Sequence, residues 1–285
     1  ARMKKLFVAD MKKKFAILFI LFLPLLLSAR SDTSFRLLKM VQGDFIDFSV
    51  DNLDNMYVLT SRNQVKKFNS NGDSVGIYND VRKFGQATLI DVSNPLKVLL
   101  YYRDFATVVM LDRFLNVVNT TDLRKQGILQ ARAIRQSKDN KIWVYDELEK
   151  KKKKVDEDGK LLQETPDFRL LLIESVSPVK IVDENKYVYL YDPARGVYVF
   201  DYFGALKNAI LIQQWQNFKV SGKYIYGTLA GKLYRYEIKS ALYDEWPLPD
   251  AVKESQSFNF SSTRVYALKR NCEGQNSCLY IYTIR

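Results

Sequence analysis

The chain has 285 residues, of which 44 are Lys or Arg, 32 are Asp or Glu, and none is His. Without His it cannot hold a Ser-His-Asp triad, a Cys-His nucleophile pair or a His-based zinc site. Residues 1–30 contain seven basic and one acidic residue, so the remainder has 37 basic and 31 acidic residues, a net charge of +6, which is too mild for a nucleic-acid-binding surface.

The N-terminal segment has the composition of a secretory signal peptide. Three lysines at 12–14 precede 13 uninterrupted apolar residues at 15–27, and two small residues follow before the sequence turns polar. This stretch is shorter than the ~20 residues that span a bilayer as a helix. We predict a signal peptide region over residues 1–30, with Met11 as initiator, and a mature chain that is periplasmic or otherwise exported, without an integral membrane span. An uncleaved N-terminal anchor is the alternative.

A segment recurs six times after residue 30. Each copy has a polar turn, a short β-rich run, and a second β-run that ends in an acidic or polar turn. The first runs begin at Met56, Val98, Ile142, Val188, Ile225 and Val265. Successive starts differ by 42, 44, 46, 37 and 40 residues. A period near forty with several short strands in each copy is typical of a β-propeller blade.

The second β-run leads into a turn that begins with Asp or Asn. Val65–Phe68 precedes Asn69, and Val197–Phe200 precedes Asp201; Gly follows three residues after the Asp or Asn in three copies. Gly at such a position permits the positive φ of a tight hairpin turn. The second copy has Leu115 where Gly is usual. We therefore predict two hairpins, and so a four-stranded antiparallel sheet, in each copy.

The two ends of the repeat region complement each other. Phe35–Val41 is a β-run before the first turn, and the sixth copy ends at Leu279–Ile284, one strand after its second hairpin begins. The N-terminal run can supply the missing outer strand of the last blade and remove a free sheet edge. The predicted fold class is all-β: a six-bladed β-propeller of four-stranded antiparallel blades, closed by the N-terminal strand, as one domain over residues 31–285.

The order of polar turn, aromatic-rich strand, variable loop, apolar strand and Asp-x-x-Gly turn resembles bacterial six-bladed propellers of the NHL and TolB-like kind. The resemblance covers about residues 35–285. A Tyr- and Lys-rich propeller behind a signal peptide is also similar to envelope propellers of Bacteroidota, such as the plug subunit of the type IX secretion translocon. This resemblance implies a periplasmic protein that binds a secretion or outer-membrane component.

Lys150–Lys154 is the densest run of one charge. It aligns with Val65–Phe68 of the first copy and leads into the turn at Asp156. We interpret it as a strand that presents lysines on its exposed face, where they guard against edge aggregation. A polybasic patch for anionic surfaces is the alternative.

Loops on one face of a propeller gather around the central channel. Strand alignment places Arg62, Arg103 and Arg195 in equivalent turns between the second and third strands, and Phe105 lies beside Arg103. Arg and aromatic residues dominate interface hot spots. We predict that these four residues bind an envelope protein partner. Solvated arginines are the alternative, and Trp215 in a neighbouring connection is interpreted as blade core.

Cys272 and Cys278 are the two cysteines of the chain and are separated by five residues. In an exported protein such a pair is typical of a disulfide, which here would cross-link two strands of the last blade. A metal pair is the alternative, but zinc sites need four ligands and the chain has no His and no further Cys.

The sequence contains no constellation typical of catalysis. The carboxylates that could act as acids, Asp104, Asp146, Glu147 and Asp192, lie in turns where acidic residues are ordinary. We therefore expect no enzymatic activity, no cofactor and no metal, and a non-catalytic scaffold, plug or assembly factor of the cell envelope. The alternative is a carbohydrate- or peptidoglycan-binding or -cleaving propeller, which needs carboxylates converging on the channel.

Overall fold

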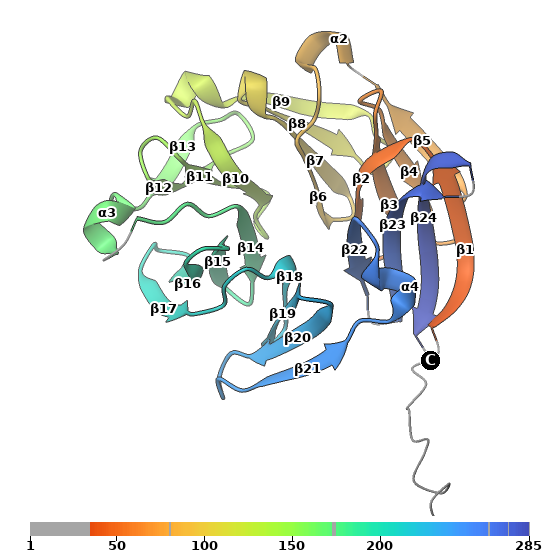
Figure 1. The fold of residues 1–285 in the computed structure, drawn as a ribbon. Helices are drawn as coiled ribbons and strands as arrows, with labels where there is room; N and C mark the ends of the chain where they lie inside the picture. Colours follow the sequence, from red (N-terminus) through yellow and green to blue (C-terminus); the bar gives the residue numbers. More distant parts are fainter. Residues whose placement is uncertain (1–34, 80, 173–174, 262, 273, 285) are drawn as a thin grey trace, which may run out of the picture. The chain divides into compact units, whose positions relative to one another are not determined.

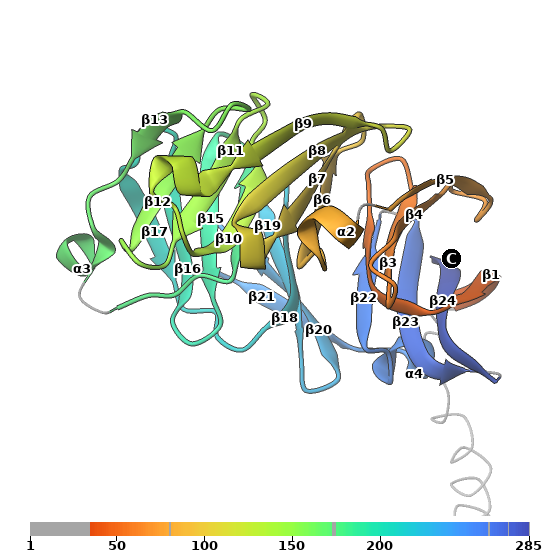
Figure 2. The same cartoon turned by 90° about the horizontal axis from the view of Figure 1, so that it is seen from above.

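Six four-stranded antiparallel sheets surround a central channel, and each sheet is one blade of a propeller (Figure 1, Figure 2). The computed structural model describes residues 35–284 apart from residues 80, 173–174, 262 and 273. The predicted signal peptide therefore lies outside the described residues, and the boundary at residue 30 stays a prediction. No helix in the described part of the chain is long and apolar enough to cross a membrane. The predicted all-β, six-bladed architecture is confirmed.

In blades 1 to 5 the strands follow the chain from the channel outward. Blade 1 consists of β2 (Phe45–Val50), β3 (Met56–Thr60), β4 (Val65–Phe68) and β5 (Ser74–Tyr78). Blade 2 consists of β6 (Leu89–Asn94), β7 (Lys97–Tyr102), β8 (Thr107–Asp112) and β9 (Val117–Asp122). Blade 3 consists of β10 (Ala131–Gln136), β11 (Ile142–Asp146), β12 (Lys151–Val155) and β13 (Leu161–Glu164).

Blades 4 to 6 follow the same plan. Blade 4 consists of β14 (Lys180–Glu184), β15 (Tyr187–Asp192), β16 (Gly196–Asp201) and β17 (Leu206–Ile210). Blade 5 consists of β18 (Gln216–Ser221), β19 (Tyr224–Leu229), β20 (Lys232–Glu237) and β21 (Tyr243–Pro247). Blade 6 consists of β22 (Ser257–Phe260), β23 (Arg264–Cys272), β24 (Gln275–Ile284) and β1 (Phe35–Gly43). The loops contain the short helices α2 (Val81–Phe84), η2 (Arg103–Phe105), η3 (Leu123–Gln126), α3 (Phe168–Leu171) and α4 (Asp250–Lys253). Every predicted first β-run is the second strand of its blade.

Blade 6 is completed by the first strand of the described chain. β1 pairs antiparallel with β24, beginning with Phe35 opposite Ile284, as predicted. Val41 packs against the core between blades 6 and 1, whereas Leu37 and Leu38 are about half exposed, at 49% and 48%. Backbone pairing and the packing of Val41 therefore contribute more to closure than the two exposed leucines.

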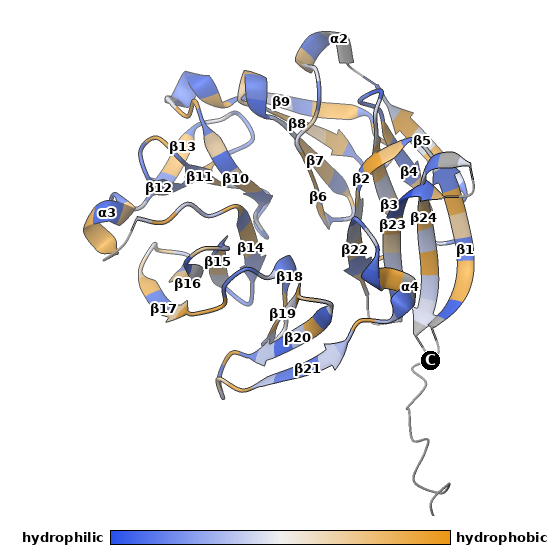
Figure 3. Cartoon of the chain, in the orientation of Figure 1, coloured by the Kyte–Doolittle hydropathy of each residue, from blue (hydrophilic) through white to orange (hydrophobic). Residues whose placement is uncertain are grey.

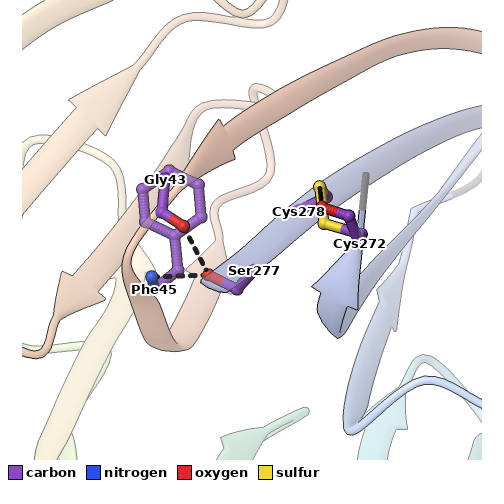
Figure 4. The surroundings of a disulfide bond; sticks show 5 residues. All are labelled: Gly43, Phe45, Cys272, Ser277 and Cys278. Atoms are coloured by element: carbon purple, nitrogen blue, oxygen red, sulfur yellow. Dashed lines mark hydrogen bonds between the residues drawn. A yellow bond between two sulfur atoms is a disulfide. The ribbon is translucent and has the colours of Figure 1, made fainter. Parts of the chain in front are cut away.

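A disulfide joins Cys272 of β23 to Cys278 of β24, with the two Cα atoms 6.0 Å apart, as predicted (Figure 4). The hydroxyl of the adjacent Ser277 donates to the carbonyl of Gly43 at 2.9 Å and accepts the N–H of Phe45 at 2.6 Å. Ser277 is buried. This hydroxyl ties the last blade to the point where the chain passes from β1 into blade 1.

The turns between third and fourth strands share one geometry in blades 1 to 4. A side-chain oxygen of the first turn residue accepts the N–H groups two and four residues later; these first residues are Asn69, Asp112, Asp156 and Asp201. Three residues after them φ is positive: 80° at Gly72, 71° at Leu115, 88° at Gly159 and 93° at Gly204. Glycine adopts this conformation without strain. In blade 2 Leu115 adopts it instead and buries its side chain between blades 1 and 2.

Among the described residues the hydrophobic core forms six clusters, of which five lie between two neighbouring blades. The sixth packs the connection that contains α4 against blade 6. Figure 3 accordingly shows apolar residues spread over all blades. Between blades 3 and 4, for example, Phe168 stacks on Phe200 with ring centroids 5.1 Å apart, beside the fully buried Trp143. Aromatic side chains supply the large buried area that flat neighbouring sheets need in order to pack.

The prediction that the lysine run lies on an exposed strand face is wrong. The run forms β12 as expected, but Lys152, Lys153 and Lys154 are buried, at 1%, 2% and 9% exposure. Each ammonium group has a specific neighbour within the blade. Lys153 pairs with the buried Asp146 at 2.8 Å, and the ammonium of Lys152 lies 4.1 Å from the centre of the Trp143 ring. These contacts, which a one-dimensional charge pattern does not reveal, replace solvent around the lysines.

Candidate functional site

One face of the propeller, here called the loop face, carries the turns between second and third strands and the connections between blades. Backbone hydrogen bonds join the two kinds of loop: the N–H of Glu147 donates to Gln130 at 2.9 Å, and that of Phe168 donates to Lys150 at 2.8 Å. The same pairing recurs where Leu248 donates to Gly231 at 2.9 Å. Because their backbones are fixed to each other, these loops form a continuous surface of defined geometry.

The four residues predicted to bind a partner all lie on the loop face. Arg62, Arg103 and Arg195 occupy the turns between the second and third strands of blades 1, 2 and 4, and all three are exposed. Phe105, in η2 of blade 2, is 42% exposed. The topology thus places the three arginines in equivalent turns, although at different positions within each turn, and the role of the four residues in binding stays a prediction.

Apolar side chains lie in the loops between the arginine-bearing turns. Leu148 in the turn of blade 3, Leu170 in the connection to blade 4 and Leu211 in the connection to blade 5 are all exposed, Leu170 at 83%. Glu147 in the same turn of blade 3 is engaged by Lys150 at 2.7 Å. The carboxylate therefore does little to offset the positive charge of the arginines on either side.

Trp215 belongs to the core, as interpreted from the sequence. Its ring stacks on Tyr234 with centroids 5.4 Å apart and packs against the cluster between blades 4 and 5. Gly227 of β19 makes this possible, because a Cβ there would lie 2.6 Å from the Trp215 ring. The tryptophan is partly buried and thus fixes the packing of blade 5.

The carboxylates named as candidate acids do not converge. Asp146 is buried and paired with Lys153, and Asp192 is buried and accepts the N–H groups of Ser177 and Ala194 at 2.7 and 2.8 Å. The two carboxylate oxygens of Asp192 therefore hold the backbone of two loops in place. Among the residues that the structure describes, no group of three or more Cys, Asp or Glu side chains could hold a metal ion.

The central channel holds a cavity of about 830 Å³, lined by the innermost strands of all six blades. Strand register arranges part of this lining in a ring, here called the middle ring. Its members all pair with the second residue of the first β-run in their blade; they are Ser49, Asp91, Arg135, Val182, Lys219 and Asn259. Asp47 lies two residues before Ser49 in blade 1, and Lys180 lies two residues before Val182 in blade 4. Each therefore lies on the same side of its strand as the middle-ring residue.

Charge is distributed unevenly around the middle ring. At the level of this ring and of Asp47 and Lys180, the cations Arg135, Lys180 and Lys219 come from the adjacent blades 3, 4 and 5, whereas Asp47 and Asp91 come from blades 1 and 2. Nearer the turns between first and second strands, the cavity is also lined by Asp51, Lys138, Asp183 and Glu184. Asp91 is bound by Arg135 at 3.0 Å and by backbone N–H groups. Asp47 and Asp91 therefore do not form the pair of unengaged acids that glycoside cleavage requires.

The environment perturbs several pKa values in the channel. Burial, together with the positive charges of Arg135 and Lys219, lowers the pKa of Lys180 to about 8. The Lys180 side chain is still open to solvent along the channel, although protein surrounds it on all sides. Burial raises the pKa of Asp47, while the N–H of Phe48 and the charge of Lys180 oppose that rise.

These channel residues were not predicted from the sequence. The repeat is recognised there from the second and third strands, whose aromatic and acidic patterns recur, and the innermost strands stay unaligned. Counting back from the first β-run of the same copy places Asp91 and Arg135 seven residues before it (98 − 91 and 142 − 135) and Lys219 six residues before it (225 − 219), so their common register appears once a difference of one residue in turn length is allowed. A charged residue at the same inward position of several blades is the signal that marks a channel lining.

No known protein family and no curated protein matches this sequence. Among solved structures, the WD40 domain of Neurospora crassa Pan2 is similar, with a TM-score of 0.60, 10% identity, and 89% of this chain and 96% of that chain covered. A streptogramin B lyase has a TM-score of 0.56 and 14% identity, over 84% and 79% of the two chains. Virginiamycin B lyase from Staphylococcus aureus has a TM-score of 0.56 and 12% identity, over 84% and 80%. At such identities the likeness shows the propeller fold alone.

These comparisons correct the expectation that the chain is not an enzyme. Two of the similar structures are lyases, so the propeller fold is one on which catalysis occurs. Another similar structure is a catalytically inactive virginiamycin B lyase with quinupristin, in which a His is replaced by Ala. The present chain contains no His, so any reaction it performs would use other side chains.

Proposed function

We propose that this chain is an exported propeller of the cell envelope that docks a protein partner through its loop face. The observation that carries the proposal is the placement of three exposed arginines, Arg62, Arg103 and Arg195, in equivalent turns of blades 1, 2 and 4. A rigid ring holds the three guanidinium groups on one surface, so a partner meets them in a fixed arrangement.

The composition of the loop face fits a protein better than a membrane or a nucleic acid. Protein interfaces are enriched in Arg and aromatic residues and poor in Lys and acidic groups at their centre. Arg103 and Phe105 lie in one turn, and the exposed Leu148 and Leu170 lie between them and Arg195. We propose a partner with acidic groups for the arginines and an apolar surface for the leucines.

Two features support an envelope location. The disulfide between Cys272 and Cys278 is compatible with an exported protein, because such bonds persist in oxidising compartments. The basic and apolar pattern at residues 12–27 is typical of a secretion signal. On the resemblance to type IX plug subunits, we propose a secretion or outer-membrane component as the partner.

Charge reversal on the loop face tests the proposal. The full chain serves as bait in native envelope extract, as wild type and as the triple variant Arg62→Glu, Arg103→Glu and Arg195→Glu, and retained proteins are identified by mass spectrometry. We expect one envelope protein to be retained by the wild type and lost from the triple variant. All three arginines are exposed, so the variant should unfold at the same urea concentration as the wild type.

A second triple variant controls for the change in net charge. Lys160→Glu, Lys186→Glu and Lys239→Glu alter exposed turns on the opposite face by the same number of charges. We expect this variant to retain the partner. Retention by the loop-face variant, or equal loss from both variants, would show that the loop face is not the docking surface.

A further inference from the structure

The channel cations Arg135, Lys180 and Lys219 are not among the loop-face residues proposed to bind a partner. Lys180 follows the connection into blade 4, two residues before Val182 of the middle ring, and Arg135 and Lys219 lie on either side of Val182 in that ring. Three positive charges therefore occupy one wall of a cavity of about 830 Å³. This size is within the range of small-molecule sites.

Polar atoms on this lining lack partners within the protein. Within the described part of the chain, the Nε of Arg135 and the hydroxyl of Ser257 are buried and have no hydrogen-bond partner. Lys180 forms no hydrogen bond or ion pair with another described residue. A buried donor without an acceptor is unfavourable, whereas the Lys180 side chain is open to solvent along the channel and accessible to an acceptor that enters it.

Asp91 and Asp47 do not accept hydrogen bonds from all the donors of the three cations. Asp91 binds one nitrogen of Arg135 and two backbone N–H groups and is about 2% exposed, so its oxygens are already engaged. Asp47 lies in blade 1, on the other side of the channel, and accepts the N–H of Phe48 at 2.8 Å. Lys219 uses one of its three donors on the carbonyl of Phe260 at 2.7 Å and keeps the others for a further acceptor.

We propose that the central channel binds a small oxyanion-bearing ligand, a carboxylate or a sulfate or phosphate ester, whose anionic group lies between Arg135, Lys180 and Lys219. Guanidinium and ammonium groups in a confined site bind oxyanions through charge-assisted hydrogen bonds. Ser257 and Asn259 of blade 6 also line the channel and offer neutral polar contacts to the rest of the ligand. This inference does not depend on the proposed docking of a partner.

Calorimetric titration of the full chain tests the site with two probes. Sodium glucuronate represents a carboxylate, and sodium sulfate represents a tetrahedral ester group; both keep their charge between pH 6.5 and 9.5. We expect saturable binding of at least one probe and a loss of about tenfold or more in affinity for Lys180→Met. Lys239→Met removes an exposed lysine from an outer turn and should bind as the wild type does.

The pH dependence provides an independent readout. The groups that act on Lys180 are Arg135, Lys219, Asp91 and Asp47. Because the pKa of Lys180 lies at about 8, the wild type should lose affinity between pH 7 and 9, and Lys180→Met should not. Absence of saturable binding for both probes, or unchanged affinity in Lys180→Met, would overturn the proposal. Binding of glucuronate alone would assign a carboxylate ligand, and binding of sulfate alone an ester.

Discussion

Replacing Lys152 by Met should make the protein more stable, although Lys152 is buried in the blade. Its ammonium has no hydrogen-bond partner among the described residues and contacts the face of Trp143. Burial lowers its pKa from the ordinary 10.5 to about 8. This difference corresponds to a penalty of ~3 kcal/mol for the charged form in the folded protein. Methionine has a similar length and carries no charge, so Lys152→Met should raise the free energy of unfolding by about that amount at pH 7.

The sign of the pH dependence follows from proton linkage. Between pH 8 and 10.5 the unfolded chain holds a proton on Lys152 that the folded chain has released, so the wild type gains stability as the pH rises through this window. Below pH 8 the full penalty applies. Urea unfolding followed by tryptophan fluorescence at pH 7 and at pH 10 measures both effects. The gap between Lys152→Met and the wild type should shrink towards zero at the higher pH.

The neighbouring lysine gives a control of opposite sign. Lys153→Met removes the partner of the buried Asp146, and an uncompensated buried charge costs ~3–5 kcal/mol. The two substitutions differ by one position in β12, so a general effect of methionine in this strand would act on both alike. If Lys152→Met were less stable than the wild type at pH 7, or kept its advantage at pH 10, our account of this lysine would be refuted.

Three further predictions concern ring closure and compartment. Val41→Asn should lower the free energy of unfolding in urea by ~1–2 kcal/mol, because Val41 packs on the core beside β24. Leu38→Asn, on the half-exposed side of β1, should change it by less than ~0.5 kcal/mol. Equal effects of the two substitutions would argue against closure through this strand. Ser277→Ala should cost ~1–3 kcal/mol, since the buried N–H of Phe45 loses its acceptor, and an unchanged unfolding midpoint would contradict this. Alkylation without reductant should label neither cysteine in protein from the envelope, whereas two labelled thiols in mass spectrometry would weaken the exported location.

Local patterns were enough to predict the blades. The turn at Asp201 is encoded within five consecutive residues, because one carboxylate caps two nearby N–H groups and Gly204 takes the positive φ. Ring closure was also predictable. The sixth copy has one strand too few for a four-stranded blade, and one β-run, Phe35–Val41, belongs to none of the six copies. These features depend on neighbours in sequence or on simple counting of strands.

Features that depend on side-chain contacts between strands or between blades were not predictable in this way. A run of lysines has the pattern of a solvated strand, and only the placement of Trp143 and Asp146 on the neighbouring strand explains their burial. The channel cations were missed for the same reason: Arg135 and Lys219 are 84 positions apart in sequence and share a ring only through the register of their blades. The equivalence of the arginine-bearing turns, in contrast, was visible because it needed only the repeat.

The hydrogen bond from Ser277 to Gly43 joins residues that are 234 positions apart, and this separation affects how the chain acquires its structure. A polypeptide emerges from the ribosome with its N-terminus first, so β1 is available long before its partner β24 exists. Blades 1 to 5 can form from contiguous segments, but the sixth must wait for β24 at Gln275–Ile284. Contacts of such range carry a high loop-closure cost and form late. A chain that is truncated or stalled before β24 would therefore keep the edges of β1 and β23 open to pairing with other chains, so synthesis of β24 is itself a condition for a protected ring.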